Sequence, residues 1–393
     1  MSVQVSLRGE IEDRRWCQYA GASDRGTIFH LLEWDGVISR AYSHRCYYVM
    51  ALDASTKATG TADAIADRTV SSAETGPGTI GVLPLVRIGH VLFGVALVSM
   101  PFCDAGGILA SEASAELDII ERSVQLANEQ GVSAIELRQY HPLLSLEEID
   151  LTAGRGWACR RNSWPTDEWC VYPDVAEKKT RMVMELPSDP DALMRSFKAK
   201  LRSQIRKPSK EGLASRVGGV EMLDAFYDVF AENMRDLGSP VHSKRFFREV
   251  LQAFAERARI FIVEGRGVPM ACGLTLGFRD TLNNPWASSL RKYSQLSPNM
   301  LLYWAMLEYG CQQGYKRFDF GRSTFGESTY RFKEQWGARA EPLFWYRFVH
   351  ESHARDSLPI EGDNRRRAAE YWKRLPVSVT KVLGPRIRRY ISL

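Results

Sequence analysis

The sequence predicts an α/β protein built from two successive units, each with a mixed sheet flanked by helices. Short runs rich in valine, leucine and aromatic residues, bounded by glycine and proline, are typical of strands. Longer segments with polar caps and helically spaced apolar residues lie between them. The order strand, helix, strand occurs twice over similar lengths, without residue-level identity between the halves, which indicates a duplicated unit.

The first half carries four strand-like runs and one clearly marked helix. We expect the strands at residues 46–52, 80–88, 91–100 and 133–140. The helix should follow Ser111 as its cap and end at Gly131, which can adopt the left-handed conformation. Residues 53–79 are small and polar, and their few apolar residues do not recur at helix or strand spacing. We therefore predict a long surface insertion there.

The second half repeats this order. Strands are expected at residues 180–187, 259–265, 270–280, 286–293 and 316–321, and helices at 191–207, 222–238 and 298–313. Ser297 can cap the last helix, Pro298 suits its first position, and Gly314 suits its end. We therefore divide the chain into a unit at 1–179, a second unit at 180–350 that carries the active site, and a basic amphipathic tail at 351–393.

The composition indicates a cytoplasmic protein. The chain has 393 residues and a formal net charge of +5, and its seven cysteines are scattered without a CxxC pair. This pattern favours reduced thiols over disulfides or a zinc site, so we expect no metal and no tightly bound cofactor. The N-terminal stretch MSVQVSLRGEIEDRRW has no apolar centre, which argues against a signal peptide. The longest apolar run, residues 91–102, has about half the length needed to span a bilayer.

The stretch FDFGRSTFGESTYRFKEQWGA, residues 318–338, is dense in aromatic and polar side chains. If its second half is helical, Phe332 and Trp336 share one face, and Tyr330 and Lys333 share another. Lys333 would then lie beside a desolvated aromatic wall, where a positive charge can stabilise developing negative charge. A solvated Lys333 is equally consistent with the residues alone.

Two further charged residues of this stretch are candidates for the same site. Arg322 follows the strand end and can point into the space beside Lys333. Asp319 is either a catalytic base or an anchor, and the alternative is a purely structural pair of Asp319 with Arg322.

A second feature is the basic run RSFKAKLRSQIRKPSK, residues 195–210, which contains seven cations and no acid. Arg195, Lys198, Arg202 and Arg206 fall at helical spacing, so one face could bind the phosphates of a tRNA, a coenzyme or a nucleotide-linked sugar. Such a run can equally be a solvated helix face.

Several long stretches resemble the FemAB branch of the GNAT superfamily, and more narrowly its proteins associated with PEP-CTERM/exosortase exopolysaccharide systems. These stretches are RSQIRKPSKEGL, FYDVFAENMRDLGSPVHSKRFF, NPWASSLRKYSQLSPNMLLYW and GYKRFDFGRSTFGESTYRFKEQWGA, together with HLLEW, GVLPLVRI and LFGVALVSMPFCDAGG nearer the N-terminus. The similarity covers most of residues 26–346 in order.

The resemblance implies two tandem GNAT-like acyltransferase domains, with an acyl donor and an acceptor meeting in a cleft near the second. Fem transferases move an aminoacyl group from aminoacyl-tRNA to an amine of a cell-wall precursor. The family's pattern is a Phe-Lys pair followed by an aromatic residue and a glycine. In this sequence the pattern is matched by Phe332, Lys333, Trp336 and Gly337. By this match Lys333 would neutralise charge on the acyl carbonyl or on the donor's terminal phosphate, without acting as a nucleophile.

These arguments give two sets of candidate residues. The candidate catalytic residues are Lys333, Arg322, Tyr330 and Asp319. The candidate donor-binding and substrate-binding residues are Arg202, Arg206, Lys210, Trp286, Arg291, Asn299, Phe332 and Trp336.

Two departures from the family pattern bear on the donor. Pro208 should end or kink the basic helix. The loop QLSPNM has no glycine, although close backbone approach to a pyrophosphate needs small residues, so ordinary CoA binding is disfavoured. The helix start at Asn299 can still face a phosphate. The alternatives are an N-acyltransferase that uses acyl-CoA or an acyl carrier protein, and a non-catalytic scaffold in polysaccharide assembly.

The composition of the C-terminal tail bears on where in the cell the protein acts. Residues 364–393 contain nine arginines and lysines and a single acid, Glu370, with apolar and aromatic residues interleaved. This composition is typical of a surface that lies against anionic lipids. We therefore expect peripheral association with the inner membrane, with docking of a basic helix on the protein's own acidic surface as the alternative.

Overall fold

The computed structural model of the chain describes residues 2–6, 10–53, 78–90, 94–146, 169–174, 179–350 and 362–392. The predicted insertion at 53–79 lies almost entirely outside these residues. Within the described ranges, the helices are all too short or too polar to cross a bilayer.

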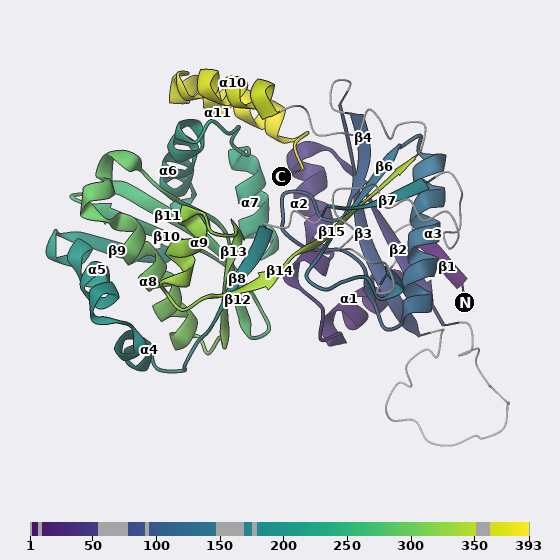
Figure 1. The fold of residues 1–393 in the computed structure, drawn as a ribbon, viewed down its shortest axis with the longest axis horizontal. Coiled ribbons are helices and arrows are strands. Elements are labelled where there is room, and N and C mark those ends of the chain that lie inside the picture. Colours follow the sequence, from purple (N-terminus) through teal and green to yellow (C-terminus); the bar gives the residue numbers. More distant parts are fainter. Residues whose placement is uncertain are drawn as a thin grey trace.

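Two mixed sheets lie side by side and define two units (Figure 1). The first sheet has the order β1-β2-β3-β4-β6-β15-β7, with β5 paired to β3, and the second has the order β14-β8-β13-β12-β11-β10-β9. The first contains β1 (Ser2–Ser6), β2 (Arg45–Leu52), β3 (Thr79–His90), β4 (Gly94–Val98), β5 (Leu109–Ala110), β6 (Ala134–Gln139), β7 (Trp169–Asp174) and β15 (Phe344–His350). The second contains β8 (Lys179–Glu185), β9 (Leu213–Gly218), β10 (Ala258–Gly265), β11 (Val268–Phe278), β12 (Thr281–Ser289), β13 (Arg317–Thr324) and β14 (Arg339–Pro342).

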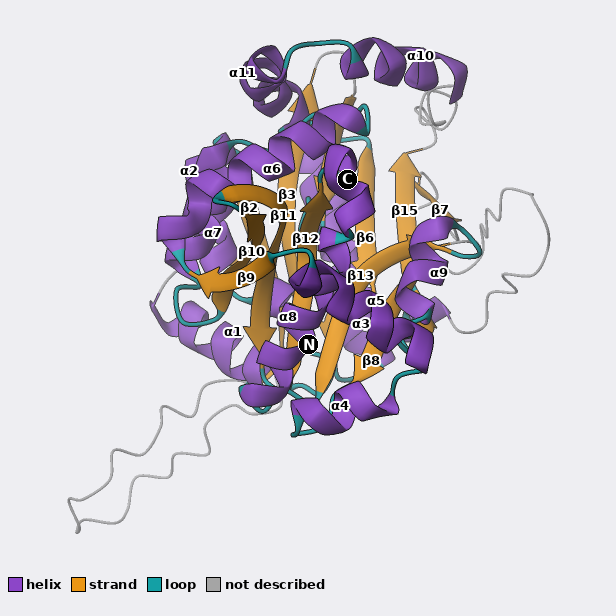
Figure 2. Ribbon diagram, turned by 90° about the vertical axis from the view of Figure 1, so that its left-hand side faces the viewer, coloured by secondary structure: helices purple, strands orange, loops and turns teal. Residues whose placement is uncertain are grey.

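Helices cover both sheets (Figure 2). They are α1 (Glu10–Ala22), α2 (Glu33–Tyr42), α3 (Ala113–Glu129), α4 (Pro190–Ser196), α5 (Ala199–Lys210), α6 (Leu223–Asp236), α7 (Lys244–Ala253), α8 (Pro298–Gln312), α9 (Ser328–Glu334), α10 (Gly362–Lys373) and α11 (Val377–Arg388). Apolar residues of α3 pack on the first sheet, and those of α4, α5 and α8 pack on one face of the second. A third core joins α2 to α6 and α7, so the two units share buried surface, as in the contact of Trp34 with Phe254 at 5.1 Å between ring centroids.

Strand β15 crosses between the units. It follows β14 of the second sheet, yet it pairs with β6 and β7 of the first. Its alternating apolar residues Tyr346 and Phe348 are buried in the first core, which explains why the strand inserts there. The division of the chain at residues 179 and 350 stays a prediction. The pairing of β15 with β6 and β7 shows that the end of the predicted second unit completes the first sheet.

The predicted α/β architecture with two mixed sheets is confirmed, and most strand positions agree within a few residues. The expected cap at Ser111 is wrong, because the cap residue of α3 is Glu112 and the Ser111 hydroxyl donates to the Ile80 carbonyl. The expected helix over 191–207 is two helices, broken at Phe197. Pro208 sits in the last turn of α5, which ends at Lys210, so the predicted end of the basic helix near this proline is confirmed.

The tail forms two helices, α10 and α11, at one end of the molecule (Figure 2). Helix α11 packs on α6, where Lys381 pairs with Asp228 at 2.5 Å. Arg235 of α6 also donates to the Leu375 carbonyl at 3.1 Å. Part of the basic tail therefore docks on the protein's own surface, while Tyr371 and Val382 remain exposed.

Candidate active site

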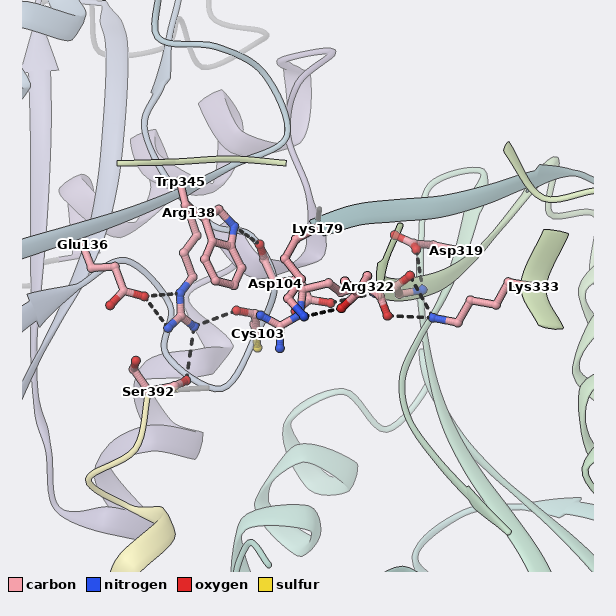
Figure 3. Close-up of polar contacts among 12 residues, drawn as sticks. Cys103, Asp104, Glu136, Arg138, Lys179, Asp319, Arg322, Lys333, Trp345 and Ser392 are labelled. Carbon is pink, nitrogen blue, oxygen red and sulfur yellow. Dashed lines mark hydrogen bonds and ion pairs between the residues drawn. The ribbon is translucent and has the colours of Figure 1, made fainter. Parts of the chain in front are cut away.

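Lys333 is a buried lysine at the junction of the two units. It lies on α9, its side chain is nearly inaccessible at 7% exposure, and its ammonium donates to the carbonyls of Gly321 at 3.1 Å and Arg322 at 2.8 Å (Figure 3). An ammonium group has three N–H donors, and two of them have acceptors among the described residues, which leaves a third that could bind a ligand. The solvated alternative for Lys333 is thereby excluded.

Asp319 shapes the loop that receives Lys333. One carboxylate oxygen accepts from the Gly321 N–H at 2.7 Å, and the other pairs with Arg181 at 2.6 Å. Gly321 has φ of 73°, a left-handed conformation that favours glycine. The guanidinium of Arg181 in turn stacks on Tyr140 of the first unit, 4.1 Å from the ring centroid. Asp319 therefore anchors this loop to β8 and, through Arg181, to the first unit.

Arg322 faces the first unit rather than Asp319. Its backbone N–H donates to Asp104 at 3.2 Å, its Nε lies 3.6 Å from the same carboxylate, and its guanidinium lies 5.0 Å from the Trp345 ring centroid. Trp345 donates to the Asp104 carbonyl at 3.2 Å. The proposed structural pair of Asp319 with Arg322 is therefore wrong, because each has a different partner.

Aromatic side chains form the wall beside Lys333. Tyr303 of α8 stacks on Phe320 at 5.6 Å between centroids and meets Phe332 edge-on at 5.0 Å. Phe332 and Trp336 lie 6.3 Å apart, as their spacing predicted, and Trp336 is fully buried. Tyr330 is half-buried against Phe325 instead.

The buried setting changes the electrostatics of Lys333. Burial lowers its pKa from 10.5 to about 8, Asp104 and Asp319 raise it in part, and Arg322 lowers it further. The group thus gains or loses its charge near physiological pH, which is typical of functional sites.

The second sheet opens next to this loop. Strands β12 and β13 pair in parallel only as far as Asn283 and Asp319, although both strands continue beyond those residues. The next residues beyond this pairing include Asn284 on β12 and Ser323 on β13. Their buried side-chain polar atoms have no hydrogen-bond partner within the described part of the chain. The Asn284 amide does lie near the Tyr303 hydroxyl. Unpaired buried polar groups are costly and uncommon, so this divergence can receive a ligand group that pairs with them.

The basic run lies over the start of α8. Arg206 and Lys210 are exposed on α5, and Lys207 donates to the Gln295 carbonyl, 2.6 Å away, in the turn before α8. Asn299 lies in the first turn of α8, whose start has no side-chain cap. The Lys207 contact is the link between the α5 cations and this helix start.

Two other predicted residues, Arg202 and Trp286, have structural partners, and Arg291 lies near the start of α8. Arg202 donates to the Phe197 carbonyl at 2.5 Å and holds the break between α4 and α5, so the expected continuous stripe does not form. Trp286 packs edge-on against Phe246 and Phe247 in the shared core. Arg291 is exposed on the turn that precedes α8.

Sequence reasoning did not find the partners of the Lys333 loop. Asp104 and Tyr140 of the first unit, Arg181 of β8 and Trp345 of β15 are far apart in the sequence and form no local motif. The one signal was the stretch CDAGG, which formed part of the family resemblance and contains Asp104.

Comparison with known proteins supports the fold. Residues 195–334 match the family described as acetyltransferase (GNAT) domain. The crystal structure of FemX matches with a TM-score of 0.62 at 12% identity, covering 90% of this chain and 98% of that chain. A tandem GNAT protein from the clavulanic acid biosynthesis pathway matches with a TM-score of 0.51 at 10% identity, covering 89% and 98%. The sequence has no match among curated proteins.

The fold is therefore that of two tandem GNAT-like units, as predicted. The matched residues, which make up about a third of the chain, contain Lys333, Arg322 and the α5 cations, and their similarity to an acetyltransferase (GNAT) domain supports an acyltransferase.

Proposed function

We propose that the protein transfers an aminoacyl group, as the FemAB-like resemblance implies, to an amine of a cell-envelope or exopolysaccharide precursor. The observation that carries this proposal is Lys333, a buried cation with a free donor, held by two carbonyls at a junction to which both units contribute. An activated aminoacyl ester of a tRNA is the proposed donor. No metal is required for this reaction, because its parts are a neutral amine, a positioned carbonyl and a stabilised oxyanion.

The chemistry is an attack of the acceptor amine on the donor ester. A C–N bond forms, the ester C–O bond breaks, and the amine proton passes to the leaving hydroxyl. The free N–H of the Lys333 ammonium can donate to the carbonyl oxygen as negative charge develops there. Arg322 and Asp319 position the loop that holds Lys333, and the cations of α5 bind the donor's phosphates.

Acyl-CoA or an acyl carrier protein as donor is the second candidate. The GNAT match favours it, because this fold generally uses acyl-CoA. The glycine-free turn before α8 disfavours it, because residues 295–300 cannot cradle a pyrophosphate as closely as glycines would. The third candidate function is a non-catalytic scaffold, for which we expect no turnover with either donor.

The deciding experiment incubates the purified protein with labelled aminoacyl-tRNA and, separately, with labelled acyl-CoA, each with envelope precursors that carry a free amine. Label in the precursor identifies the donor. Donor binding without transfer in both reactions would leave only the scaffold.

The first prediction concerns donor phosphates. We expect charge reversal at Arg206 and Lys210 to weaken donor binding at least tenfold, and the affinity of the parent protein to fall steeply with salt, since both residues are exposed cations on one helix. Binding is measured by fluorescence anisotropy of labelled tRNA. Arg248→Glu, an exposed cation on α7, serves as the control. Binding that does not depend on salt would show that the basic residues of α5 are solvated side chains that do not contact the donor.

The second prediction concerns the membrane. Tyr371, Val382 and Leu383 are exposed on α10 and α11, beside the exposed cations Arg366 and Arg374, which is a surface suited to anionic lipids. We expect Val382→Glu with Leu383→Glu to reduce co-sedimentation with anionic vesicles at low salt several-fold. Transfer from a soluble donor should continue. Equal sedimentation of the parent and the double variant would show that these helices are structural only.

A further inference from the structure

The loop that brings Asp104 to the candidate active site has a strained backbone. Met100 and Phe102 have φ of 44° and 70°, in the left-handed region that residues other than glycine rarely adopt. Such conformations persist only where the surrounding structure holds them, and they cluster at functional sites. Asp104 follows directly in this loop, and its carboxylate accepts from the Arg322 N–H at 3.2 Å. The contacts that hold residues 100–104 therefore also set the position of Asp104.

The segment that follows α11 holds this loop. The Ser392 carbonyl accepts from the Phe102 N–H at 2.7 Å. Nη1 of Arg138, a fully buried residue, donates to the Ser392 carbonyl at 3.2 Å and to the Cys103 carbonyl at 2.8 Å (Figure 3). Glu136 fixes this guanidinium by accepting from its Nε at 2.8 Å and from its Nη2 at 2.6 Å. The segment and the loop thus share one rigidly held donor, in addition to their direct hydrogen bond.

Residues 388–392, here called the C-terminal segment, contact both units. In the first unit, the His44 imidazole donates through Nε2 to the Arg389 carbonyl at 2.7 Å. In the second unit, Nε of Arg388 donates to Nε2 of His242 at 3.1 Å, and α11 packs on α6. The segment is therefore held by the second unit at its start and reaches the strained loop of the first unit at its end.

We infer that the C-terminal segment is a positioning element of the active site, which holds Asp104 where it can fix the loop that receives Lys333. Two residues after Phe102, Asp104 accepts from the Arg322 N–H, and the Arg322 carbonyl accepts from the Lys333 ammonium at 2.8 Å (Figure 3). The hydrogen bonds thus lead from the segment to the lysine. An effect of the segment on catalysis depends on the proposed function, whereas its coupling to the Lys333 loop does not.

The test displaces α11 without altering any residue of this network. A β-carbon at Gly384 would lie 2.9 Å from the backbone nitrogen of Val241, closer than such atoms approach in proteins, so Gly384→Leu must move the helix. Ser378→Leu, at an exposed position of the same helix, is the matched control. Hydrogen–deuterium exchange is followed by mass spectrometry in peptides that contain Phe102 and Arg322. We expect Gly384→Leu to speed exchange in both peptides at least tenfold, and the control to match the parent protein.

Two results of this measurement would overturn the inference. Faster exchange at Phe102 alone would show that the coupling stops before the Lys333 loop, and unchanged exchange at Phe102 would show that α11 does not hold the segment. If Gly384→Leu also speeds exchange in β10, the whole fold is loosened, and His44→Phe decides instead. That variant keeps a ring beside Phe102 and removes only the donor to the Arg389 carbonyl. It should speed exchange in both peptides several-fold, and no change would likewise overturn the inference.

The role in catalysis is tested separately with the donor that proves active. In Gly384→Leu, kcat should fall at least tenfold while KM for the donor stays unchanged, because the α5 cations are not part of this network. An unchanged kcat, or a change in KM alone, would refute a positioning role. If the parent protein transfers nothing from either donor, the proposed function fails, and the exchange measurement still decides whether the C-terminal segment is coupled to the Lys333 loop.

Discussion

Replacing Lys333 by alanine is expected to slow acyl transfer by a factor that corresponds to about 2 to 4 kcal/mol of transition-state stabilisation. The ammonium is buried and two carbonyls fix its position, and in the proposed reaction its third donor stabilises the negative charge that develops on the acyl carbonyl. The rate is measured by single-turnover transfer from whichever donor proves active. Arg331→Ala, an exposed cation on the same helix, should leave the rate unchanged.

The same lysine predicts a pH dependence with a definite sign. Its pKa is lowered to about 8 by burial, so the active ammonium is lost as pH rises through that value, and the transfer rate should fall. Between this pKa and the ordinary value of 10.5 the unfolded chain binds more protons, so Lys333 makes the folded state relatively more stable as pH rises. Lys333→Met keeps most of the side-chain volume and should abolish both effects. An unchanged rate in the alanine and methionine variants would remove Lys333 from the mechanism.

Replacing Asp319 by asparagine is expected to destabilise the protein by about 3 kcal/mol, because it removes the buried partner of the Arg181 guanidinium and leaves that group only the half-exposed Glu341, 3.1 Å away. The side chains of this pair are only 15% and 3% exposed, and the atoms are 2.6 Å apart. Asparagine keeps an oxygen for the Gly321 N–H, so the variant isolates the loss of charge. The shift is measured as a change in urea unfolding midpoint at constant m-value.

The matched control is Asp280→Asn in the exposed pair of Asp280 with Arg317, whose side chains are 39% and 45% exposed. That pair should contribute less than about 1 kcal/mol, because water screens it. Equal effects of the two substitutions would show that Asp319 is no more important to the fold than a surface charge. Because Asp319 also shapes the Gly321 loop, its variant should slow transfer as well.

Local patterns determined much of this protein. Runs of β-branched and aromatic residues located nine of the fifteen described strands, but not β1, β5, β7, β9, β14 or the crossing strand β15. Glycines at helix ends, such as Gly131 and Gly314 with φ of 60° and 77°, marked where helices stop. These features depend on neighbours in the chain, so the sequence contains them directly. The pattern around Lys333 likewise marked the loop and the aromatic wall, because Phe332 and Trp336 are close in sequence.

Tertiary structure alone decided the partners of the charged residues. Asp319 meets Arg181, Arg322 meets Asp104, and Trp345 reaches them on a strand that crosses into the other sheet. No periodicity encodes these pairings, because they depend on how two sheets and a returning strand pack together. The charge of a lysine also cannot be read from its neighbours in sequence, because the burial that lowers the pKa of Lys333 exists only once α9 packs beside β13.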